Sequence, residues 1–222
     1  MSYKSLYFPK LKRRVKYSNY THYRHFRQEI REDCLGRCVY CDAHENEIGG
    51  QEAMTLDHFK PKSSFPHLAH EPFNLLWACQ TCNRLKDNYW PAIGTPHTLA
   101  KNQRGFVDPF TEHLAKYFDI LPNGQFVALK PPANFIISTL KLNRSSAKKI
   151  REQRNRRYER KREFEAFYTR AIKNLEQLLA NPSLSEEDKA ALLQSKQELE
   201  KQFNGLIREL EPDFSLPKFR PK

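Results

Sequence analysis

The sequence lacks any apolar run long enough to cross a membrane. A membrane-spanning helix needs about 20 consecutive apolar residues, whereas the longest runs here, such as residues 73–79 interrupted by Asn74, extend over only a few residues. The first seven residues also lack the continuous apolar core of a secretory signal. We therefore expect a folded, cytoplasmic protein that has no membrane partner.

Acidic residues are scarce relative to basic ones. The 222-residue chain contains 38 Lys and Arg residues against 26 Asp and Glu residues, and its net charge is +12. Such a positive field attracts polyanions and speeds their encounter, which makes nucleic acid the first partner to consider. The alternative explanation is a generic basic surface. Hydrophobic residues make up 39% of the chain, which is enough for a packed core.

Basic and aromatic residues are interleaved in the first segment, residues 1–33. The first 31 residues contain nine Lys and Arg residues, seven Phe and Tyr residues and a single acidic residue, Glu29. This combination suits the phosphates and bases of a nucleic acid. Alternatively, the rings pack on the core while the charges stay solvated, and both descriptions can hold together.

Two C-x2-C pairs, Cys38 with Cys41 and Cys79 with Cys82, predict a zinc site. Four thiolates at this spacing can bind one tetrahedral zinc ion, and in a reducing compartment such pairs are more often metal ligands than disulfides. A closed shell of four thiolates leaves no position for substrate, so the predicted zinc is structural. Cys34 is expected to be a buried, inert thiol.

The segment between the cysteine pairs predicts a ββα unit. Residues 54–61 form a short β-type run that ends at Pro61, which cannot donate a ladder hydrogen bond. A second run, residues 74–78, leads directly into Cys79, and good helix formers follow from Gln80 to about Tyr89. The order is therefore strand, loop, strand, helix.

The motifs over about residues 34–91 resemble the HNH, or ββα-metal, endonuclease family. They are the first C-x2-C pair, Asp57-His58 followed by Pro61, Asn74-Leu75, and the second C-x2-C pair followed by Asn83 and, three residues later, Lys86. The resemblance implies an α+β fold with a zinc-stapled ββα-metal core and a mainly α-helical C-terminal region. It also implies an enzyme that hydrolyses phosphodiester bonds.

The resemblance assigns a role to each motif residue. His58 would be the general base, Asp57 and Asn83 the ligands of a catalytic Mg²⁺ or Mn²⁺ ion, and Asn74 the central asparagine that orients the site. A neutral imidazole can take a proton from water near pH 7, and carboxylate and amide oxygens suit Mg²⁺. The metal would offset negative charge on the phosphate.

Two details of this arrangement follow from secondary structure. Neighbouring residues of a strand face opposite sides, so Asp57 and His58 must lie at a strand end or a bend to serve one phosphate. Lys86 lies one helical turn beyond Asn83 and is expected to bind a substrate phosphate, with a solvated helix lysine as the alternative. Asn83 directly follows the last cysteine, where bound zinc would fix its direction.

The chain is expected to have three parts. After residues 1–33, residues 34–115 form the nuclease core with its four-cysteine site, and residues 116–222 form a β-hairpin followed by a basic helical hairpin. An Asn123-Gly124 turn connects the two predicted strands. One helix is expected from about Ser145 through Leu179, and an antiparallel one after a cap at Ser185. The first helix is densely basic and is either solvated or phosphate-facing.

Within the HNH family, the sequence resembles the nuclease subunits of Septu-type and retron-associated antiphage systems. This narrower resemblance rests on the four cysteines, on Asp57-His58-Phe59-x-Pro61-Lys62, on the stretch at residues 104–109 and on the basic helical C-terminus. It implies a DNA endonuclease that acts as a defence effector with a partner ATPase. The alternatives are a non-catalytic zinc-dependent nucleic-acid-binding or adaptor protein and an RNA-directed HNH nuclease.

Overall fold

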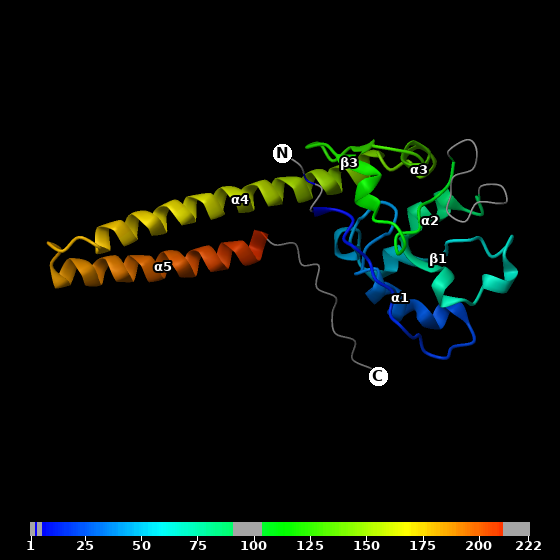
Figure 1. Ribbon diagram of the computed structural model, residues 1–222, viewed down its shortest axis with the longest axis horizontal. Coiled ribbons are helices and arrows are strands. Elements are labelled where there is room, and N and C mark those ends of the chain that lie inside the picture. The colour runs from blue at the N-terminus through cyan, green and yellow to red at the C-terminus, as the bar shows by residue number, and fades with distance from the viewer. Residues whose placement is uncertain (1–2, 4–5, 91–103, 211–222) are drawn as a thin grey trace. The chain divides into compact units, whose positions relative to one another are not determined.

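The computed structural model describes residues 3, 6–90 and 104–210. Pro91, the last residue of the stretch that resembles HNH nucleases, lies outside this range. The described residues form two compact units, one up to Glu152 and one from Gln153 onward, and helix α4 (Ser145–Leu179) begins in the first and continues into the second (Figure 1). The division into three parts at residues 33 and 115 stays a prediction. None of the helices in the described ranges has the length and apolarity to cross a membrane.

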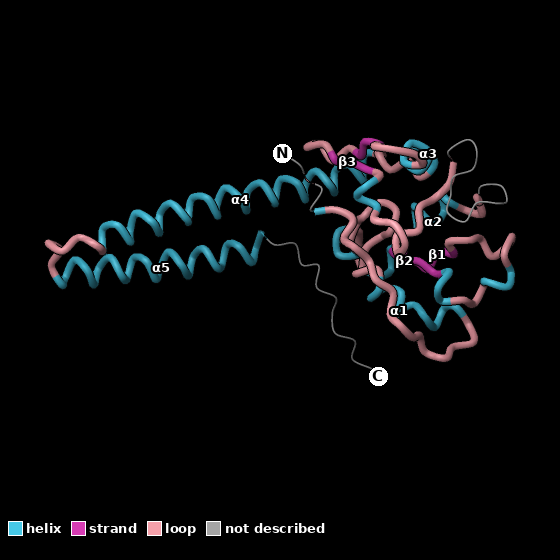
Figure 2. Tube along the Cα trace, in the orientation of Figure 1, coloured by secondary structure: helices cyan, strands magenta, loops and turns pink. Residues whose placement is uncertain are grey.

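A two-stranded sheet and a helix form the centre of the first unit. Strand β1 (Met54–His58) pairs antiparallel with β2 (Leu75–Cys79), so that His58 lies opposite Leu75. Helix α2 (Gln80–Lys86) follows β2 without a loop. Figure 2 shows these elements together with helix α1 (Arg27–Asp33). The predicted strand, loop, strand, helix order is confirmed, and His58 ends its strand as expected.

Burial explains the composition of β2. All five of its residues are buried, which is why the strand reads as a continuous apolar run and not as an alternating one. Helices α1 and α2 both pack against it. The Arg27 guanidinium of α1 lies 4.5 Å from the ring centroid of the buried Trp77 and adds a cation–π contact.

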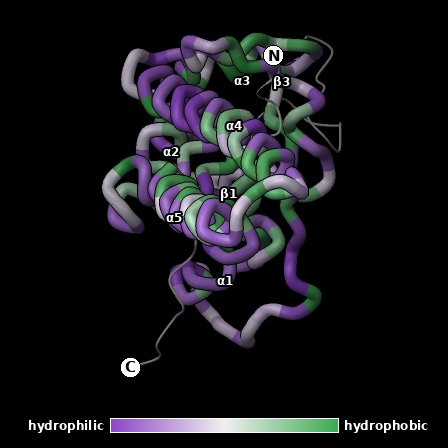
Figure 3. The backbone as a smooth tube through the Cα atoms, turned by 90° about the vertical axis from the view of Figure 1, so that its left-hand side faces the viewer, coloured by the Kyte–Doolittle hydropathy of each residue, from purple (hydrophilic) through white to green (hydrophobic). Residues whose placement is uncertain are grey.

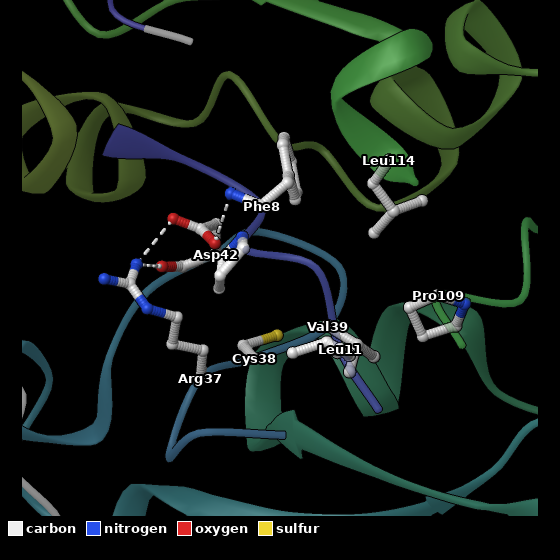
Figure 4. Close-up of a pocket in the computed structure, with 9 residues that line it drawn as sticks. Phe8, Leu11, Arg37, Cys38, Val39, Asp42, Pro109 and Leu114 are labelled. Atoms are coloured by element: carbon white, nitrogen blue, oxygen red, sulfur yellow. Dashed lines mark hydrogen bonds and ion pairs between the residues drawn. The ribbon is translucent and has the colours of Figure 1, made fainter. Parts of the chain in front are cut away.

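The N-terminal segment is anchored to this core by its rings and backbone. Figure 4 shows Asp42 accepting hydrogen bonds from the Phe8 backbone N–H at 2.9 Å and from Arg37 at 2.8 Å, beside an apolar cavity of about 10 Å³. The Tyr7 hydroxyl donates to the Arg151 carbonyl at 3.0 Å. Ring packing is thus confirmed for several aromatic residues of the segment, which are buried: Tyr3, Tyr7, Phe8, Tyr17 and Phe26.

A second two-stranded sheet, β3 (Phe118–Ile120) with β4 (Phe126–Ala128), confirms the predicted hairpin. Its turn differs from the predicted Asn123-Gly124 turn, because the Gly124 N–H donates to the Leu121 carbonyl and Pro122-Asn123 occupy the centre. The proline ring fixes a negative φ, which excludes a turn that needs positive φ at its first central residue. Gly124 instead takes the left-handed position after the turn, with φ of 74°.

The remaining elements are helical. Helix α3 (Ala133–Thr139) packs on β4, and α4 is followed by an antiparallel α5 (Glu186–Leu210), as the sequence predicts. The Ser185 hydroxyl accepts from the Asp188 N–H at 3.1 Å and caps α5. Figure 3 shows hydrophilic and hydrophobic residues alternating along both long helices. Short 3-10 helices complete the fold: Tyr23–Phe26, Glu45–Glu47, Gln51–Ala53, Pro66–Leu68, Pro72–Asn74 and Leu114–Lys116.

Candidate active site

The four paired cysteines converge in one buried cluster. Their Sγ atoms all lie within 4.8 Å of one another, and those of Cys41 and Cys79 are 3.9 Å apart. Four thiolates that share a tetrahedral zinc at about 2.3 Å lie roughly 3.8 Å from each other. The five cysteines of the chain are free thiols. The cluster is therefore compatible with a structural zinc ion.

The cluster favours ionised sulfur at Cys79 and Cys41, which have lowered pKa values, whereas the pKa values of Cys38 and Cys82 are raised. Hydrogen bonds from neighbouring cysteines, Cys38 first, lower the pKa of Cys79. The Arg144 guanidinium lies 3.9 Å from the Cys82 Sγ and 4.0 Å from the Cys79 Sγ. Four thiolates around Zn²⁺ carry a net charge of −2, so an arginine beside two of the sulfurs offsets part of it. Arg144 is a contributor that the sequence analysis missed, because 62 residues separate it from Cys82.

Cys34 stands apart from this chemistry. It is fully buried, and burial raises the pKa of its thiol to about 12. A thiol with that pKa is neutral at physiological pH and is a poor nucleophile and metal ligand. The predicted burial of Cys34 is confirmed, and its inertness stays a prediction.

A cleft of about 310 Å³ brings three predicted site residues together. His58 and Asp57 enter it from the end of β1, and Asn83 enters it from α2. Two exposed cations, Lys62 and Arg84, stand at the same cleft. The other lining residues are Tyr23, Thr55, Leu56, Pro61, Asp87 and Asn88.

His58 has the geometry of a general base. Its Nε2 lies 2.9 Å from the Ala69 carbonyl oxygen, which can only accept, so Nε2 carries the hydrogen. The neutral ring then has its lone pair on Nδ1. Partial burial lowers the pKa of His58, against the opposing effect of the Ala69 carbonyl. The Tyr23 ring packs edge to face on the imidazole, with 4.9 Å between centroids. His58 is thus held in one orientation as an uncharged base at neutral pH.

Asp57 is buried and is held by two donors. It accepts hydrogen bonds from the Tyr40 hydroxyl and, at 3.2 Å, from the Lys86 ammonium. Burial raises the pKa of Asp57, while Lys86 and Tyr40 oppose this effect. A carboxylate has roughly four acceptor positions, so two donors leave capacity for a cation. With the Asn83 amide in the same cleft, the oxygen donors present fit Mg²⁺ or Mn²⁺.

Asn74 lies outside the cleft lining and shapes it through the backbone. Its buried amide accepts from the Lys60 N–H at 2.9 Å and donates to the carbonyls of Lys60 at 3.0 Å and Leu68 at 3.2 Å. These bonds tie together both ends of the loop that leaves His58 and reaches Ala69. Because the Ala69 carbonyl in turn contacts the His58 ring, Asn74 is placed to fix the orientation of that ring.

The structure gives Lys86 a position that differs from the expected substrate contact. Its side chain is buried, and its ammonium donates to Asp57 and, at 2.7 Å, to the His58 carbonyl. Helix α2 packs on β1, so the residue one turn after Asn83 faces the strand instead of the open cleft. The exposed cations at the cleft are Lys62 and Arg84. Of these, the Asp57-to-Lys62 motif already contained Lys62, although no role was assigned to it.

Comparison with known proteins agrees with this geometry. Residues 38–88 match the HNH endonuclease family. The chain is 23% identical over 138 residues to Septu protein PtuA of Bacillus mycoides (strain KBAB4), a similarity that covers 53% of this chain and 19% of that protein. This chain therefore corresponds to about a fifth of that relative. No solved structure gives a significant match. The four cysteines and His58, Asp57, Asn74 and Asn83 all lie within residues 38–88, and this part of the chain is an HNH endonuclease domain.

Proposed function

We propose that this chain is a metal-dependent endonuclease that hydrolyses phosphodiester bonds in DNA. One observation carries the proposal: a half-buried His58, with its Nε2 hydrogen committed to Ala69 and its Nδ1 lone pair available, shares a cleft with Asp57 and Asn83. The net charge of +12 and the exposed Lys62 and Arg84 at the cleft favour a polyanionic substrate.

The chemistry follows from these positions. His58 Nδ1 takes a proton from water, whose oxygen then bonds to phosphorus. The bond from phosphorus to the leaving oxygen breaks, and that oxygen takes a proton from solvent. The resemblance to HNH nucleases implies a 5′-phosphate and a 3′-hydroxyl as products. Asp57 and Asn83 would hold Mg²⁺ or Mn²⁺, which supplies positive charge against the phosphate. Lys62 and Arg84 would bind neighbouring phosphates.

The four-cysteine cluster would hold the start of α2, and with it Asn83, in place. Cys79 ends β2 and Cys82 lies in α2, directly before Asn83. A zinc ion bound there would fix the start of α2 and with it the direction of the Asn83 side chain. In this proposal zinc is structural and the hydrolytic metal is a separate ion.

We further propose that the nuclease is a cytoplasmic effector of antiphage defence. The similarity to Septu protein PtuA supports this role, as does the motif resemblance to the nuclease subunits of such systems. A partner ATPase that restrains or triggers cleavage would be part of the same system. The competing functions are cleavage of RNA and binding of nucleic acid without cleavage.

A cleavage assay with a matched histidine control tests the proposal. Purified protein is incubated with plasmid DNA or RNA, with Mg²⁺ or EDTA and with any neighbouring gene product. His58→Ala should abolish cleavage while binding and zinc content stay unchanged. His67→Ala, an exposed histidine outside the cleft, should leave the rate near that of wild type.

Four outcomes would contradict parts of the proposal. Unchanged cleavage by His58→Ala would exclude His58 as the general base. Cleavage that persists in EDTA would exclude Asp57 and Asn83 as ligands of a catalytic metal. Cleavage of RNA alone would identify the RNA-directed alternative. Binding of nucleic acid without cleavage under every condition would identify the chain as a non-catalytic binding or adaptor protein.

A further inference from the structure

A second hollow in the nuclease unit combines an exposed ring, Phe73, and the partly buried ring of Phe110 with cations. It measures about 810 Å³, within the roughly 300–1,000 Å³ range of small-molecule sites. It shares no lining residue with the His58 cleft. The lining residues are Lys10, Leu11, Lys12, Arg13, Phe73, Asp108, Phe110 and Thr111, and we call this surface the Phe73 hollow.

The Phe73 ring is fixed but uncovered. It is 57% exposed, although an apolar ring of this size usually gains stability by burial. Tyr17 packs edge to face against it with 5.1 Å between centroids, and the Tyr17 hydroxyl is itself held by Asp33 at 2.6 Å. A rigid ring that remains exposed in a lined hollow is typical of a binding surface.

Arg13 lines the hollow and contacts both of its rings. Its guanidinium lies 4.0 Å from the Phe110 ring centroid and 5.8 Å from that of Phe73. It donates to the carbonyls of Pro72 at 3.0 Å and Leu75 at 3.1 Å, which flank Phe73 and Asn74. These contacts hold the Arg13 guanidinium in one orientation against the two rings. The two rings are therefore preorganised before any ligand binds.

The charges of the hollow select a polyanion. Lys10 and Lys12 are exposed and Arg13 adds a third positive charge, whereas Asp108 is the acidic residue of the lining. One Asp108 oxygen already accepts the Phe110 N–H at 2.9 Å. Lysines beside exposed aromatic faces are the combination that binds phosphates and unpaired bases together.

We infer that the Phe73 hollow binds an unpaired stretch of a nucleic-acid strand, with a base stacked on Phe73 and phosphates on Lys10 and Lys12. Bases inside a duplex are stacked on each other and present no face to a protein ring, so the occupant is single-stranded. The inference rests on the proposed function, because it assumes that nucleic acid is the substrate. It adds that the enzyme binds substrate with an unpaired segment near the 3-10 helix Pro72–Asn74.

The test measures binding of a labelled 20-nucleotide oligo-dT and of a duplex of the same length, by fluorescence anisotropy in buffer without Mg²⁺. Phe73→Ala should weaken oligo-dT binding roughly 5- to 100-fold, as expected for the loss of one base–aromatic stack, and duplex binding far less. Phe73→Trp should retain affinity because it keeps a stacking face. Phe167→Ala removes an equally exposed ring, 57%, from α4 and should change little.

The salt dependence of binding tests the role of Lys10 and Lys12. Replacing both Lys10 and Lys12 by Ser should lower the slope of log affinity against log salt by about 1.4, since each phosphate contact to a single strand contributes roughly 0.7. Replacing Lys189 and Lys201 of α5 in the same way is the control for net charge. Zinc content and thermal unfolding of each variant establish that it is folded.

Several results would overturn the inference. Phe73→Ala and Phe167→Ala could bind oligo-dT equally, or Phe73→Ala could weaken single-strand and duplex binding alike. Displacement of oligo-dT by an acidic peptide at equal concentration of charge would assign the hollow to a protein ligand. Because these measurements involve binding only, absence of cleavage would refute the proposed function and leave this inference standing. Normal cleavage together with an unchanged affinity of Phe73→Ala for oligo-dT would refute this inference and leave the proposed function standing.

Discussion

Replacement of Lys86 by Met tests whether the buried ion pair, instead of a substrate contact, is the task of this lysine. The Lys86 ammonium lies 3.2 Å from Asp57, and the two side chains are 0% and 5% exposed. Methionine keeps an unbranched stem of similar size and removes the charge. The Asp57 carboxylate then stays buried with the Tyr40 hydroxyl as its remaining donor among the contacts described above.

The expected cost follows from burial. Removing one partner of a buried ion pair destabilises a protein by about 3–5 kcal/mol, because the other charge stays behind without compensation. Neither side chain is exposed enough for solvent to screen the loss. Lys116→Met is a matched control, since its pair with Glu112 is 4.0 Å long with side chains 62% and 43% exposed. That substitution should change the free energy of unfolding by no more than about 0.5 kcal/mol.

Urea unfolding of zinc-saturated protein, followed by circular dichroism, measures both effects. The double variant Lys86→Met with Asp57→Asn should be less destabilised than the sum of the single variants, because it removes both charges. If Lys86→Met costs less than about 1 kcal/mol, or no more than Lys116→Met, the structural role of the ion pair is refuted. A stable Lys86→Met protein that loses affinity for nucleic acid would restore the substrate contact first indicated by the motif.

Four further predictions concern the residues and the metal that stabilise the fold. Asn74→Ala should cost about 1–3 kcal/mol in urea unfolding and slow cleavage, because it leaves backbone groups of Lys60 unpaired; a normal rate would exclude the positioning role. Gly124→Ala should destabilise by at least about 2 kcal/mol, since φ is 74° and a Cβ would lie 2.3 Å from the Lys148 oxygen. Gly205→Ala, which meets nothing within 4 Å, should instead stabilise α5 by about 0.5–1 kcal/mol in thermal unfolding. Purified protein should contain one zinc by atomic absorption, and a chelator that removes it should lower the unfolding midpoint; metal-free protein of equal stability would contradict the zinc site.

Local signals account for what the sequence predicted correctly. Cysteine spacing, apolar runs and the Ser185 cap each depend on residues close together in the chain, so the ββα order, the cysteine cluster and the α4–α5 hairpin could be read directly. The two strands are short, but their ends are marked by Pro61 and Cys79. These features needed no knowledge of long-range contacts.

The misplaced features depend on packing between distant segments. Helical spacing correctly put Lys86 one turn from Asn83, but only the packing of α2 on β1 decides that it faces Asp57. Arg144 reaches the cysteine cluster from a loop before α4, and no periodicity marks it. The turn before Gly124 was a local error, because Pro122 already excluded the turn that the Asn-Gly pair suggested.

The cysteine cluster and the cleft are coupled through the residues between and after the cysteines. Tyr40 lies between Cys38 and Cys41 and donates to Asp57, while Lys86 follows Cys82 by one turn and donates to the same carboxylate. Both donors of Asp57 thus come from segments that the cluster holds in place. Loss of a zinc ion from the cluster would therefore free Tyr40 and the start of α2 together, and with them both donors of Asp57 and the Lys86 bond to the His58 carbonyl. The His58 ring keeps a separate contact with Ala69, on a loop that Asn74 holds through the Leu68 carbonyl. We therefore expect loss of zinc to disturb the Asp57 carboxylate more strongly than the orientation of the His58 ring.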